Sequence, residues 1–260
     1  GAPAPRETLE MTSPVILRLR HHGKLGDGAA DALLSCRKRN RLVEPGQCLM
    51  RQAEEMNALF WIESGWAMRH RNLANGRRQI LNLLLPGDIC DLQGLIHTRA
   101  DHSVTAMTPV MLCEVDAGRF LDLLHNDGQL AASLLWSVVQ EEGILREHIV
   151  RIGRRSARIR LAHLLLELVR RQALGGGPSD GLIEIALTRE VMADCLGLTP
   201  VHISRTLSEL RRDGLVTLEP QGRLRIIDID ALARHADYDT RYLHLARPDH
   251  ALDRAGGAQA

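Results

Sequence analysis

The chain has 260 residues, which is enough for one large domain or for two domains of ordinary size. Hydrophobic residues make up 45% of it, but only three Trp, two Tyr and two Phe are present, so any core must be built mainly from aliphatic side chains. The formal net charge of +1 excludes neither nucleic acid nor any other partner.

Several classes of protein are disfavoured by what the sequence lacks. It has no apolar run of 18 residues and no charged-then-apolar leader, so we expect a cytoplasmic protein without membrane contact. The five cysteines form no CxxC pair, which is typical of reduced thiols that serve as small buried residues. No histidine pattern marks a metal site, and no catalytic triad can be argued. We therefore expect no metal, no cofactor and no enzymatic activity.

The first predicted domain, residues 27–127, is mainly β-structure. We expect residues 1–26 before it to be a flexible segment. Short β-prone runs alternate with turn signals between residues 40 and 116, and this regular spacing predicts a small antiparallel barrel or sandwich. The turn signals are Pro45-Gly46, Ser64-Gly65, Asn75-Gly76 and Pro86-Gly87, of which Asn75-Gly76 is a strong hairpin signal.

The period then becomes helical, and residues 128–153 predict one long helix ending in a hinge. Seven positions of this helix are spaced alternately by four and three residues, which is a heptad seam with one polar member. The period alone fits a buried core helix as well as a dimer seam, but the length favours a seam. The seam consists of Ala131, Leu135, Val138, Glu142, Leu145, Ile149 and Ile152.

The second predicted domain, residues 154–235, is basic and mainly helical, and residues 236–260 are expected to be a tail. Between Arg151 and Asp228 there are 13 arginines, no lysine and nine acidic residues, a balance of +4. A helix, a short apolar strand, two helices around a tight turn and a β-hairpin follow one another. That order is typical of a winged helix–turn–helix domain.

The segment from Ala186 to Val216 carries the helix–turn–helix signal. Gly197 supplies the turn, and Ile203 and Leu207 are expected to point inward, with Val201 at the edge. Arg205, one turn into the second helix, is placed to contact guanine in the major groove. The helix would span about residues 200–212.

A larger set of residues is expected to contact DNA, because they cap the two helices or lie on the outer face of the second. The set is Thr188, Thr199, Pro200, His202, Ser204, Arg205, Ser208, Arg211 and Arg212. The plain alternative is an ordinary helical hairpin with a solvated arginine face. The agreement of cap, turn glycine, inward apolar residues and basic outer face favours DNA binding.

Three stretches resemble one known family. "LTREVMADCLGLTPVHISRTLSELRRDGLV" resembles the helix–turn–helix of the Crp/Fnr superfamily, and "IGRRSARIRLAHLLLEL" is similar to the hinge and following helix of its FixK-like members. "NGRRQILNLLLPGDICDLQGL" resembles the effector domain of the same family. The likeness covers roughly residues 38 to 230.

The resemblance implies a fold of the α+β class. It consists of an N-terminal cyclic-nucleotide-binding-type β-barrel (a double-stranded β-helix), a long dimerisation helix and a C-terminal winged helix–turn–helix. The implied function is a homodimeric, sequence-specific transcription regulator that binds palindromic double-stranded DNA, and RNA polymerase is a further expected partner.

Two departures limit what the resemblance carries over. Many members have an acidic residue where this chain has Val201, although Ser204 and Arg205 match the Ser-Arg pair of the family, so the target sequence of relatives does not transfer. An Fnr-type iron–sulfur cluster needs an N-terminal cysteine cluster, and only Cys36 lies within the first 47 residues.

The cyclic-nucleotide site of the family is also altered. Its Gly-Glu-Leu becomes Cys90-Asp91-Leu92 and its Arg-Ser becomes His102-Ser103, so the cation for a cyclic phosphate is replaced by a weaker one. On the long helix, Leu145 and Arg146 stand about where the cyclic-AMP receptor uses two hydroxyl groups. We expect no response to cyclic AMP. The effector-pocket candidates are Cys90, Asp91, Leu92, His102, Ser103, Leu145 and Arg146.

Two other functions stay open at this point. One is a cupin-like β-barrel metalloenzyme with an accessory helix–turn–helix, which metal content distinguishes. The other is a sensor whose helix–turn–helix has become a protein-interaction module, which a genomic-DNA pull-down at two salt concentrations distinguishes.

Overall fold

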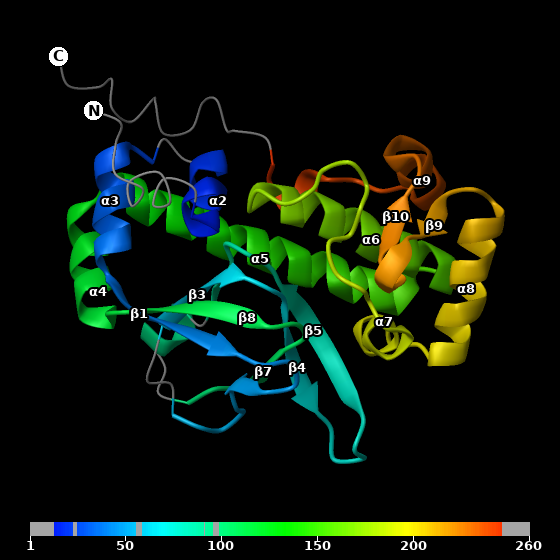
Figure 1. Ribbon diagram of the computed structural model, residues 1–260, viewed down its shortest axis with the longest axis horizontal. Coiled ribbons are helices and arrows are strands. Elements are labelled where there is room, and N and C mark those ends of the chain that lie inside the picture. The colour runs from blue at the N-terminus through cyan, green and yellow to red at the C-terminus, as the bar shows by residue number, and fades with distance from the viewer. Residues whose placement is uncertain (1–12, 23–24, 56–58, 91, 96–98, 246–260) are drawn as a thin grey trace.

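The computed structural model describes residues 13–22, 25–55, 59–90, 92–95 and 99–245. A β-barrel and a mostly helical domain lie along the long helix α5 (Gly128–Arg154), as Figure 1 shows. This arrangement confirms the predicted α+β architecture. No helix in these ranges is long and apolar enough to cross a membrane.

The barrel consists of two four-stranded antiparallel sheets. One has the order β1 (Arg37–Val43), β8 (Val110–Val115), β3 (Leu59–Ser64) and β6 (Ile89–Cys90). The other has the order β2 (Cys48–Met50), β7 (Ser103–Ala106), β4 (Ala67–Asn72) and β5 (Arg78–Leu84). Apolar side chains from both sheets form one cluster between them, because alternate residues of each strand point to the same face.

The turns behave as their residues predict. Asn75-Gly76 connects β4 to β5, with Gly76 at a φ of +79°, a conformation that a residue with a side chain rarely adopts. Gly65, at φ +81°, also lies against the carbonyl group of Pro109, so a Cβ atom has no room there. These positive-φ glycines let β3 turn into β4 and β4 into β5.

Four helices and one short turn of helix surround the barrel. Their bounds are α2 (Pro14–His22), α3 (Asp27–Ser35), η1 (Leu92–Leu95), α4 (Ala117–Asn126) and α5. α4 and α5 begin at aspartate N-caps, as Asp116 accepts from Arg119 N and Asp127 accepts from Leu130 N, each at 3.0 Å.

The expectation of a flexible segment over residues 1–26 is wrong for residues 14–22. Val15, Ile16 and Leu19 of α2 are at most 1% exposed and belong to the same core cluster as α3, α4 and the start of α5. The sequence of α2 is only nine residues long and includes two arginines and two histidines, so its apolar stripe is too short to give a clear period. Residues 1–12 and 23–24 lie outside the described ranges.

The second domain follows α5 after an extended link at Arg155 and Ser156. Helix α5 continues through Gly153 to Arg154, so the break lies just beyond the predicted hinge. The elements are α6 (Ala157–Leu174), α7 (Arg189–Leu196), α8 (Pro200–Arg212), β9 (Val216–Leu218), η2 (Pro220–Gly222), β10 (Leu224–Ile226), α9 (Ile229–Ala236) and η3 (Arg241–Leu243).

The predicted wing is present, but the strand expected before the helix–turn–helix is not. β9 and β10 form the antiparallel hairpin. The run "LIEIA" makes only an isolated bridge between Leu182 and Arg225. Its backbone is attached to the wing mainly through Ile183 N, which donates to Leu224 O at 2.8 Å.

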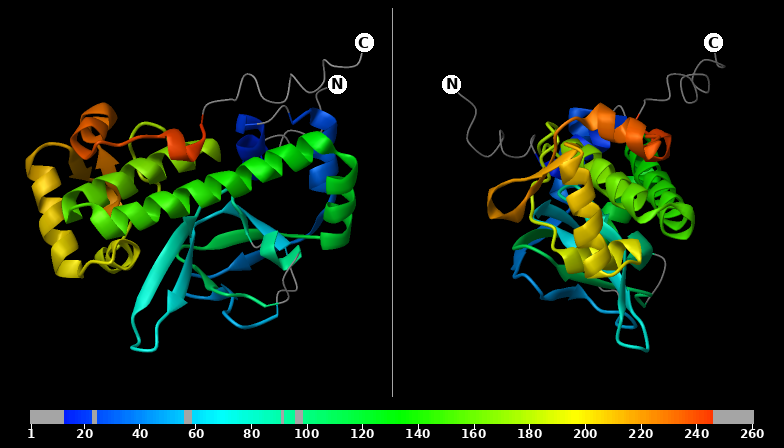
Figure 2. Two further views of the ribbon diagram at one scale, coloured as in Figure 1. Left: turned by 180° about the vertical axis from the view of Figure 1, so that it is seen from behind. Right: turned by 90° about the vertical axis from the view of Figure 1, so that its right-hand side faces the viewer.

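The segment after α9 is a second correction, because residues 237–245 do not form a loose tail. They return to the middle of α5, where Leu243 is fully buried (Figure 2). Gln140 donates a hydrogen bond to Leu243 O at 2.6 Å. Residues 246–260 of the expected tail lie outside the described ranges.

The two domains share a hydrophobic core. Trp66, Met68 and Ile80 of the barrel belong to the same buried cluster as Leu161 of α6 and Met192 of α7. The helix–turn–helix is therefore packed against the barrel and is not held by α5 alone.

Candidate DNA-binding surface and effector site

Helix α7 is shaped by its two ends. The hydroxyl oxygen of Thr188 accepts a hydrogen bond from Val191 N at 3.2 Å, and Gly197 closes the helix in the left-handed conformation (φ 62°, ψ 36°). Ala193 is buried and small. The turn then places α8 across α7.

The orientation of helix α8 is set by its N-cap and by the apolar face that it buries. Thr199 caps it by accepting from His202 N at 3.2 Å, and Pro200 takes the first helical position, where a missing N–H costs little. Ile203, Leu207 and Leu210 are at most 7% exposed, as the sequence predicts for the first two. This buried face aims the opposite face of the helix at solvent.

The predicted DNA-contacting residues lie together on the two helix starts and on the outer face of α8. Ser204 is half-buried, while all the others are exposed, namely Thr188, Thr199, Pro200, His202, Arg205, Ser208, Arg211 and Arg212. Val201, which the sequence predicts at the edge of the inner face, is 70% exposed and lies on the same outer face. The sequence signal that identifies it is its spacing of four residues from Arg205.

The electrostatics of this surface favour an anion. Within the described part of the chain, the Arg205 and Arg211 side chains make no hydrogen bond or ion pair, so both charges face solvent. Asp213, near the end of α8, is ion-paired with Arg158, and hydrogen bonding from that guanidinium lowers the pKa of Asp213. Asp194 of α7 is likewise paired with Arg78 of β5 at 2.7 Å. These carboxylates therefore do little to offset the outer arginines.

The predicted dimer seam lies on an uncovered face of α5. The aliphatic side chains of Leu135, Val138, Leu145 and Ile149 are 64%, 47%, 37% and 67% exposed in the single chain. Glu142 is exposed too, and Ala131 and Ile152 are half-buried. The opposite face of α5, which includes Leu134 and Ile144, is buried against the protein itself. α5 is thus apolar on both sides.

The effector-pocket candidates that the structure describes do not form an open nucleotide site. Cys90 is fully buried, and His102 is 3% exposed with its Nδ1 atom 2.6 Å from Asp101 Oδ1. Ser103 accepts a hydrogen bond from Gln52 N at 3.0 Å. The hydrogen bond with His102 lowers the pKa of Asp101, so Asp101 is a carboxylate at neutral pH and already occupies one nitrogen of the imidazole.

The remaining candidates are divided. Leu92 is half-buried in η1, whereas Leu145 and Arg146 lie on the exposed face of α5, where Arg146 pairs with Glu142 at 2.6 Å. Asp91 lies outside the described residues. Two partly open cavities, of about 30 and 10 Å³, lie between the barrel and the helices. Of the effector candidates that the structure describes, Leu92 alone lines one of them. Such volumes hold a water molecule or two, not a nucleotide.

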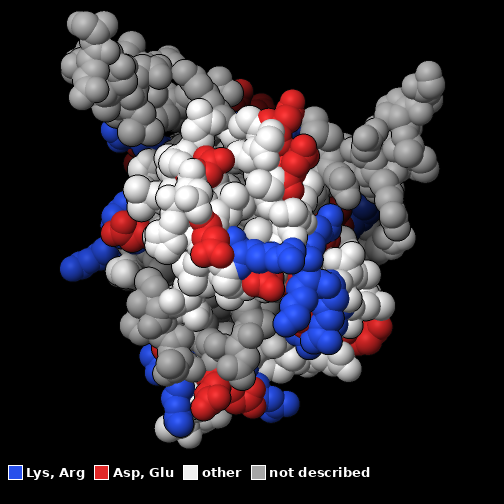
Figure 3. All heavy atoms as spheres, turned by 90° about the vertical axis from the view of Figure 1, so that its left-hand side faces the viewer, with Lys and Arg blue, Asp and Glu red and all other residues white. Residues whose placement is uncertain are grey.

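Figure 3 shows the end of the molecule formed by α3 and α4, where basic and acidic side chains are mixed on the surface. On β1, which follows α3, Arg37 pairs with Glu63, and Arg39 pairs with Glu114 at 2.6 Å. Between the two helices is an open depression of about 390 Å³. This paired surface differs from the outer face of α8, where Arg205 and Arg211 have no such partner among the described residues.

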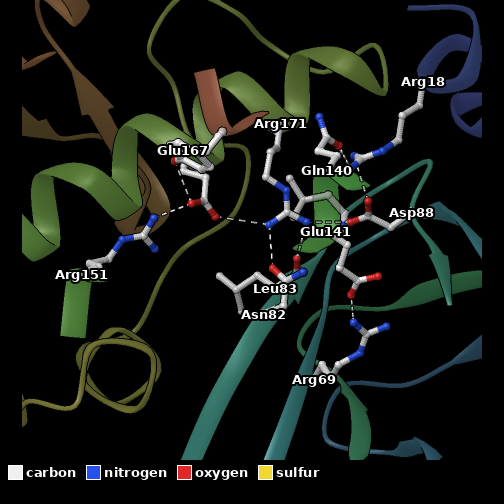
Figure 4. Close-up of polar contacts among 12 residues, drawn as sticks. Arg18, Arg69, Asn82, Leu83, Asp88, Gln140, Glu141, Arg151, Glu167 and Arg171 are labelled. Carbon is white, nitrogen blue, oxygen red and sulfur yellow. Dashed lines mark hydrogen bonds and ion pairs between the residues drawn. The ribbon is translucent and has the colours of Figure 1, made fainter. Parts of the chain in front are cut away.

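A buried polar network joins the barrel to the DNA-binding domain (Figure 4). Arg171 of α6 donates to Asn82 Oδ1 at 2.7 Å, to Leu83 O at 2.8 Å and to Asp88 at 3.0 Å. Arg18 of α2 pairs with the same Asp88 at 2.8 Å. Because breaking a buried ion pair leaves an unpaired charge, these contacts resist separation of the two domains.

The network continues along α6 to the long helix. Glu167, 2% exposed, pairs with Arg151 of α5 and accepts a hydrogen bond from the Tyr242 hydroxyl at 2.9 Å. Burial raises the pKa of Glu167, but the charges of Arg151 and Arg171 outweigh it and lower that pKa overall. Glu167 is therefore a carboxylate at neutral pH.

Three of the cysteines lie in surroundings that disfavour a reactive thiolate. Burial raises the pKa of the Cys195 thiol to about 12, and burial likewise raises the pKa values of Cys36 and Cys113. A thiol is a poor nucleophile when its pKa lies above ambient pH.

The barrel, the long helix and the exposed winged helix–turn–helix together define a DNA-binding protein with an effector-type domain. The family of Crp-like helix–turn–helix domains matches residues 159–235, and the family of cyclic nucleotide-binding domains matches residues 40–127. The transcriptional activator protein FnrL of Cereibacter sphaeroides is 31% identical over 205 residues, which cover 77% of this chain and 81% of FnrL.

Two further comparisons agree with this. The nitrogen fixation regulation protein FixK of Bradyrhizobium diazoefficiens is 28% identical over 191 residues, 72% of this chain and 79% of FixK. The structure of FixK2 from Bradyrhizobium japonicum matches with a TM-score of 0.67 at 23% identity, over 75% of this chain and 96% of that one, which shows the shared fold. The chain therefore belongs to the Crp/Fnr family of DNA-binding transcription regulators, which are not enzymes.

Proposed function

We propose that the protein acts as a homodimer that reads a palindromic DNA site by inserting one α8 helix of each protomer into the major groove. The observation that carries this proposal is the division of α8 into a buried apolar face and an exposed face with Arg205 and Arg211 unpaired among the described residues. Side chains held this way are free to meet base edges and phosphates.

Dimerisation through α5 would give the protein the twofold symmetry that a palindromic DNA site matches. The exposed aliphatic seam of α5 would be covered by its twofold mate, and two recognition helices would then lie about 34 Å apart, one turn of the duplex. Glu142, in the seam, would fix the register of the pair, as single polar seam residues do. RNA polymerase is the protein partner that a regulator bound at a promoter would meet.

The test is selection of bound duplexes from a random pool by the full-length chain, together with sedimentation of the free protein. A twofold-symmetric consensus with half-sites one helical turn apart, and a dimer at micromolar concentration, are expected. A monomer that selects a single half-site would contradict the proposal. In-vitro transcription from a promoter carrying the selected site then tests the action on RNA polymerase.

The effector domain is proposed not to respond to cyclic AMP. Three observations support this: His102 is buried and bonded to Asp101, Cys90 is fully buried, and Arg146 is paired with Glu142. None of these groups is available to a cyclic phosphate without breaking an existing contact.

No observation favours the metalloenzyme alternative. Among the described residues, no three His, Cys, Asp or Glu side chains lie close enough to hold a metal ion. The fit to a family of transcription regulators accounts for both domains without it.

A further inference from the structure

Val201 has an unusual place for an apolar side chain. At 70% it is the most exposed large hydrophobic residue in the part of the chain that the structure describes. A single exposed apolar residue is ordinary on a protein surface. Val201, however, is the second residue of α8, at the end of the helix that is proposed to enter the major groove.

The geometry of α8 places Val201 at the centre of its outer face. Residues three or four apart share one face of a helix, so Val201 is in line with Arg205, Ser208 and Arg212. Ile203 and Leu210, on the far side, are fully buried. Val201 therefore points directly away from the protein core, one helical turn before Arg205.

On the central stripe of α8, few other side chains compete with Val201 for the bases. Ser204 donates its hydroxyl proton to Pro200 O at 3.0 Å, and Ser208 donates to Ser204 O at 2.9 Å, so both serine protons are used inside the helix. Thr199 is occupied as the N-cap acceptor. On the central stripe of the first two turns, Val201 and Arg205 remain to distinguish one base pair from another.

The chemistry of the groove then selects a partner. An isopropyl group neither donates nor accepts a hydrogen bond, and the one apolar group on a base edge in the major groove is the C5-methyl of thymine. Against any other base edge, Val201 would bury polar atoms without partners. We propose that Val201 reads a thymine methyl group beside the guanine that Arg205 contacts, a proposal that rests on the proposed function of α8.

The position of that thymine follows from helix dimensions. Residues four apart are separated by about 6 Å along the helix axis. Base pairs are stacked about 3.4 Å apart. The thymine therefore lies one or two base pairs from the guanine, and each half-site of the palindrome holds one such pair.

The first experiment compares DNA selected from a random pool by the full-length chain and by its Val201→Ala variant. We expect the variant to lose its preference for thymine at one position of each half-site and to keep the preference for guanine. Leu42→Ala, which shortens another exposed apolar side chain on β1 of the barrel, is the matched control and should select the wild-type consensus. Unchanged selection by Val201→Ala would overturn the proposal.

The second experiment removes the methyl group alone. Deoxyuridine replaces that one thymine in each half-site of the selected duplex. The wild-type chain should bind each altered half-site about fourfold more weakly, the value of one buried methyl group. Val201→Ala should bind both duplexes equally. Deoxyuridine at a thymine outside the half-sites is the control and should change nothing.

The outcomes separate this proposal from the one on which it rests. If Arg205→Ala loses affinity for the selected duplex but the deoxyuridine duplex binds the wild type unchanged, α8 reads bases and Val201 does not. If Arg205→Ala does not lose affinity for the selected duplex either, the proposed role of α8 itself is wrong. An equal loss by Val201→Ala on selected and random DNA would likewise overturn the reading of thymine.

Discussion

Gly143, near the middle of α5, lies against the main-chain carbonyl group of Tyr242, with no room between them for a Cβ atom. Beside this contact, Gln140 donates to Leu243 O at 2.6 Å and the Trp136 indole donates to His244 O at 3.2 Å. The C-terminal segment of residues 237–245 is thus seated on the long helix, at a place that only glycine permits.

Gly143→Ala should therefore unseat this segment. The added methyl group overlaps backbone, which moves less readily than a side chain, and we expect the free energy of unfolding to fall by about 2 kcal/mol. Urea unfolding measures the loss, and limited proteolysis should show faster cleavage within residues 237–245.

Gly153→Ala is the matched control for this substitution. No atom lies within 4 Å of the position that its Cβ would take, and Gly153 is in the same helix. Alanine is the better helix former, so this variant should be as stable as the wild type or more stable, by up to about 1 kcal/mol. Equal destabilisation by both variants would contradict the account of Gly143.

Sequence reasoning succeeded where the signals are local. The caps Thr188 and Thr199, the turn glycine Gly197 and the inward pair Ile203 and Leu207 are all set by residues within a few positions of one another, and the structure has each as predicted. The Asn75-Gly76 hairpin is a further example, since turn geometry depends on two residues alone.

It failed where contacts are distant in sequence. Nothing in the sequence near Gly143 predicts that residue 242 returns to it. The sequence alone indicates only a residue of low helix propensity inside a predicted helix. Charged residues such as Arg171 and Glu167 are usually exposed, but both are at most 2% exposed here because Asp88 of the barrel and Arg151 of α5 partner them. Such pairing depends on how the domains dock, which periodicity does not encode.

Arg205→Ala should separate base reading from phosphate binding. Arg205 is exposed and unpaired among the described residues, so its guanidinium is free to make a bidentate contact with guanine. We expect a loss of about 1–3 kcal/mol on the selected site and a much smaller loss on random DNA, measured by titration at fixed salt.

Arg211→Ala is the companion variant of Arg205→Ala. From the last turn of α8 it should meet phosphate only, weakening binding to all sequences alike and reducing the salt dependence. Equal losses from Arg205→Ala on both DNAs would show that this arginine, too, contacts phosphate alone.

Ile149→Asp should abolish the dimer without unfolding the protomer. The side chain is 67% exposed in the single chain, so a carboxylate there remains solvated in the monomer, whereas the dimer would bury two of them. Loss of two buried isoleucines alone corresponds to roughly a hundredfold weaker association or more. Sedimentation velocity across a concentration series measures it.

A comparable change elsewhere checks that charge alone is not responsible. Leu73→Asp alters a side chain that is 49% exposed at the end of the β4–β5 hairpin, away from the seam, and should remain dimeric. A dimer that persists in Ile149→Asp would place the interface on another face.

Acid should destabilise the protein through two buried histidines. Burial lowers the pKa of His148 and of His163 to about 4, while the unfolded chain keeps the ordinary value near 6.5. The unfolded state therefore binds more protons between these values. Stability should fall as the pH drops from 6.5 to 4, by about 2 kcal/mol for each histidine.

His148→Gln tests this assignment, because glutamine stays neutral throughout the window. Urea midpoints measured from pH 7 to pH 4.5 should fall less steeply in the variant than in the wild type. The contribution of Glu167 lies at lower pH, since its pKa is below the ordinary value for glutamate, and does not confuse the comparison. Parallel curves for the two proteins would show that His148 is not a source of the slope.

Cyclic AMP and cyclic GMP, at concentrations up to the millimolar range, should leave operator affinity unchanged. A ligand shifts an equilibrium between two domain arrangements only if it binds one of them better. To bind a cyclic phosphate here, His102 would have to leave the carboxylate of Asp101, to which its Nδ1 atom is bonded at 2.6 Å. It would have to do so from a site that is 3% exposed. An arginine in its place would carry a permanent charge and a bidentate fork for the phosphate oxygens.

Calorimetry on the free protein should show no heat of binding, and titration of the selected duplex should give one curve with and without nucleotide. Micromolar binding of either nucleotide, with tighter DNA binding to match, would mean that Ser103 and backbone amides suffice for the phosphate, and that the barrel opens further than its buried His102 and Cys90 indicate.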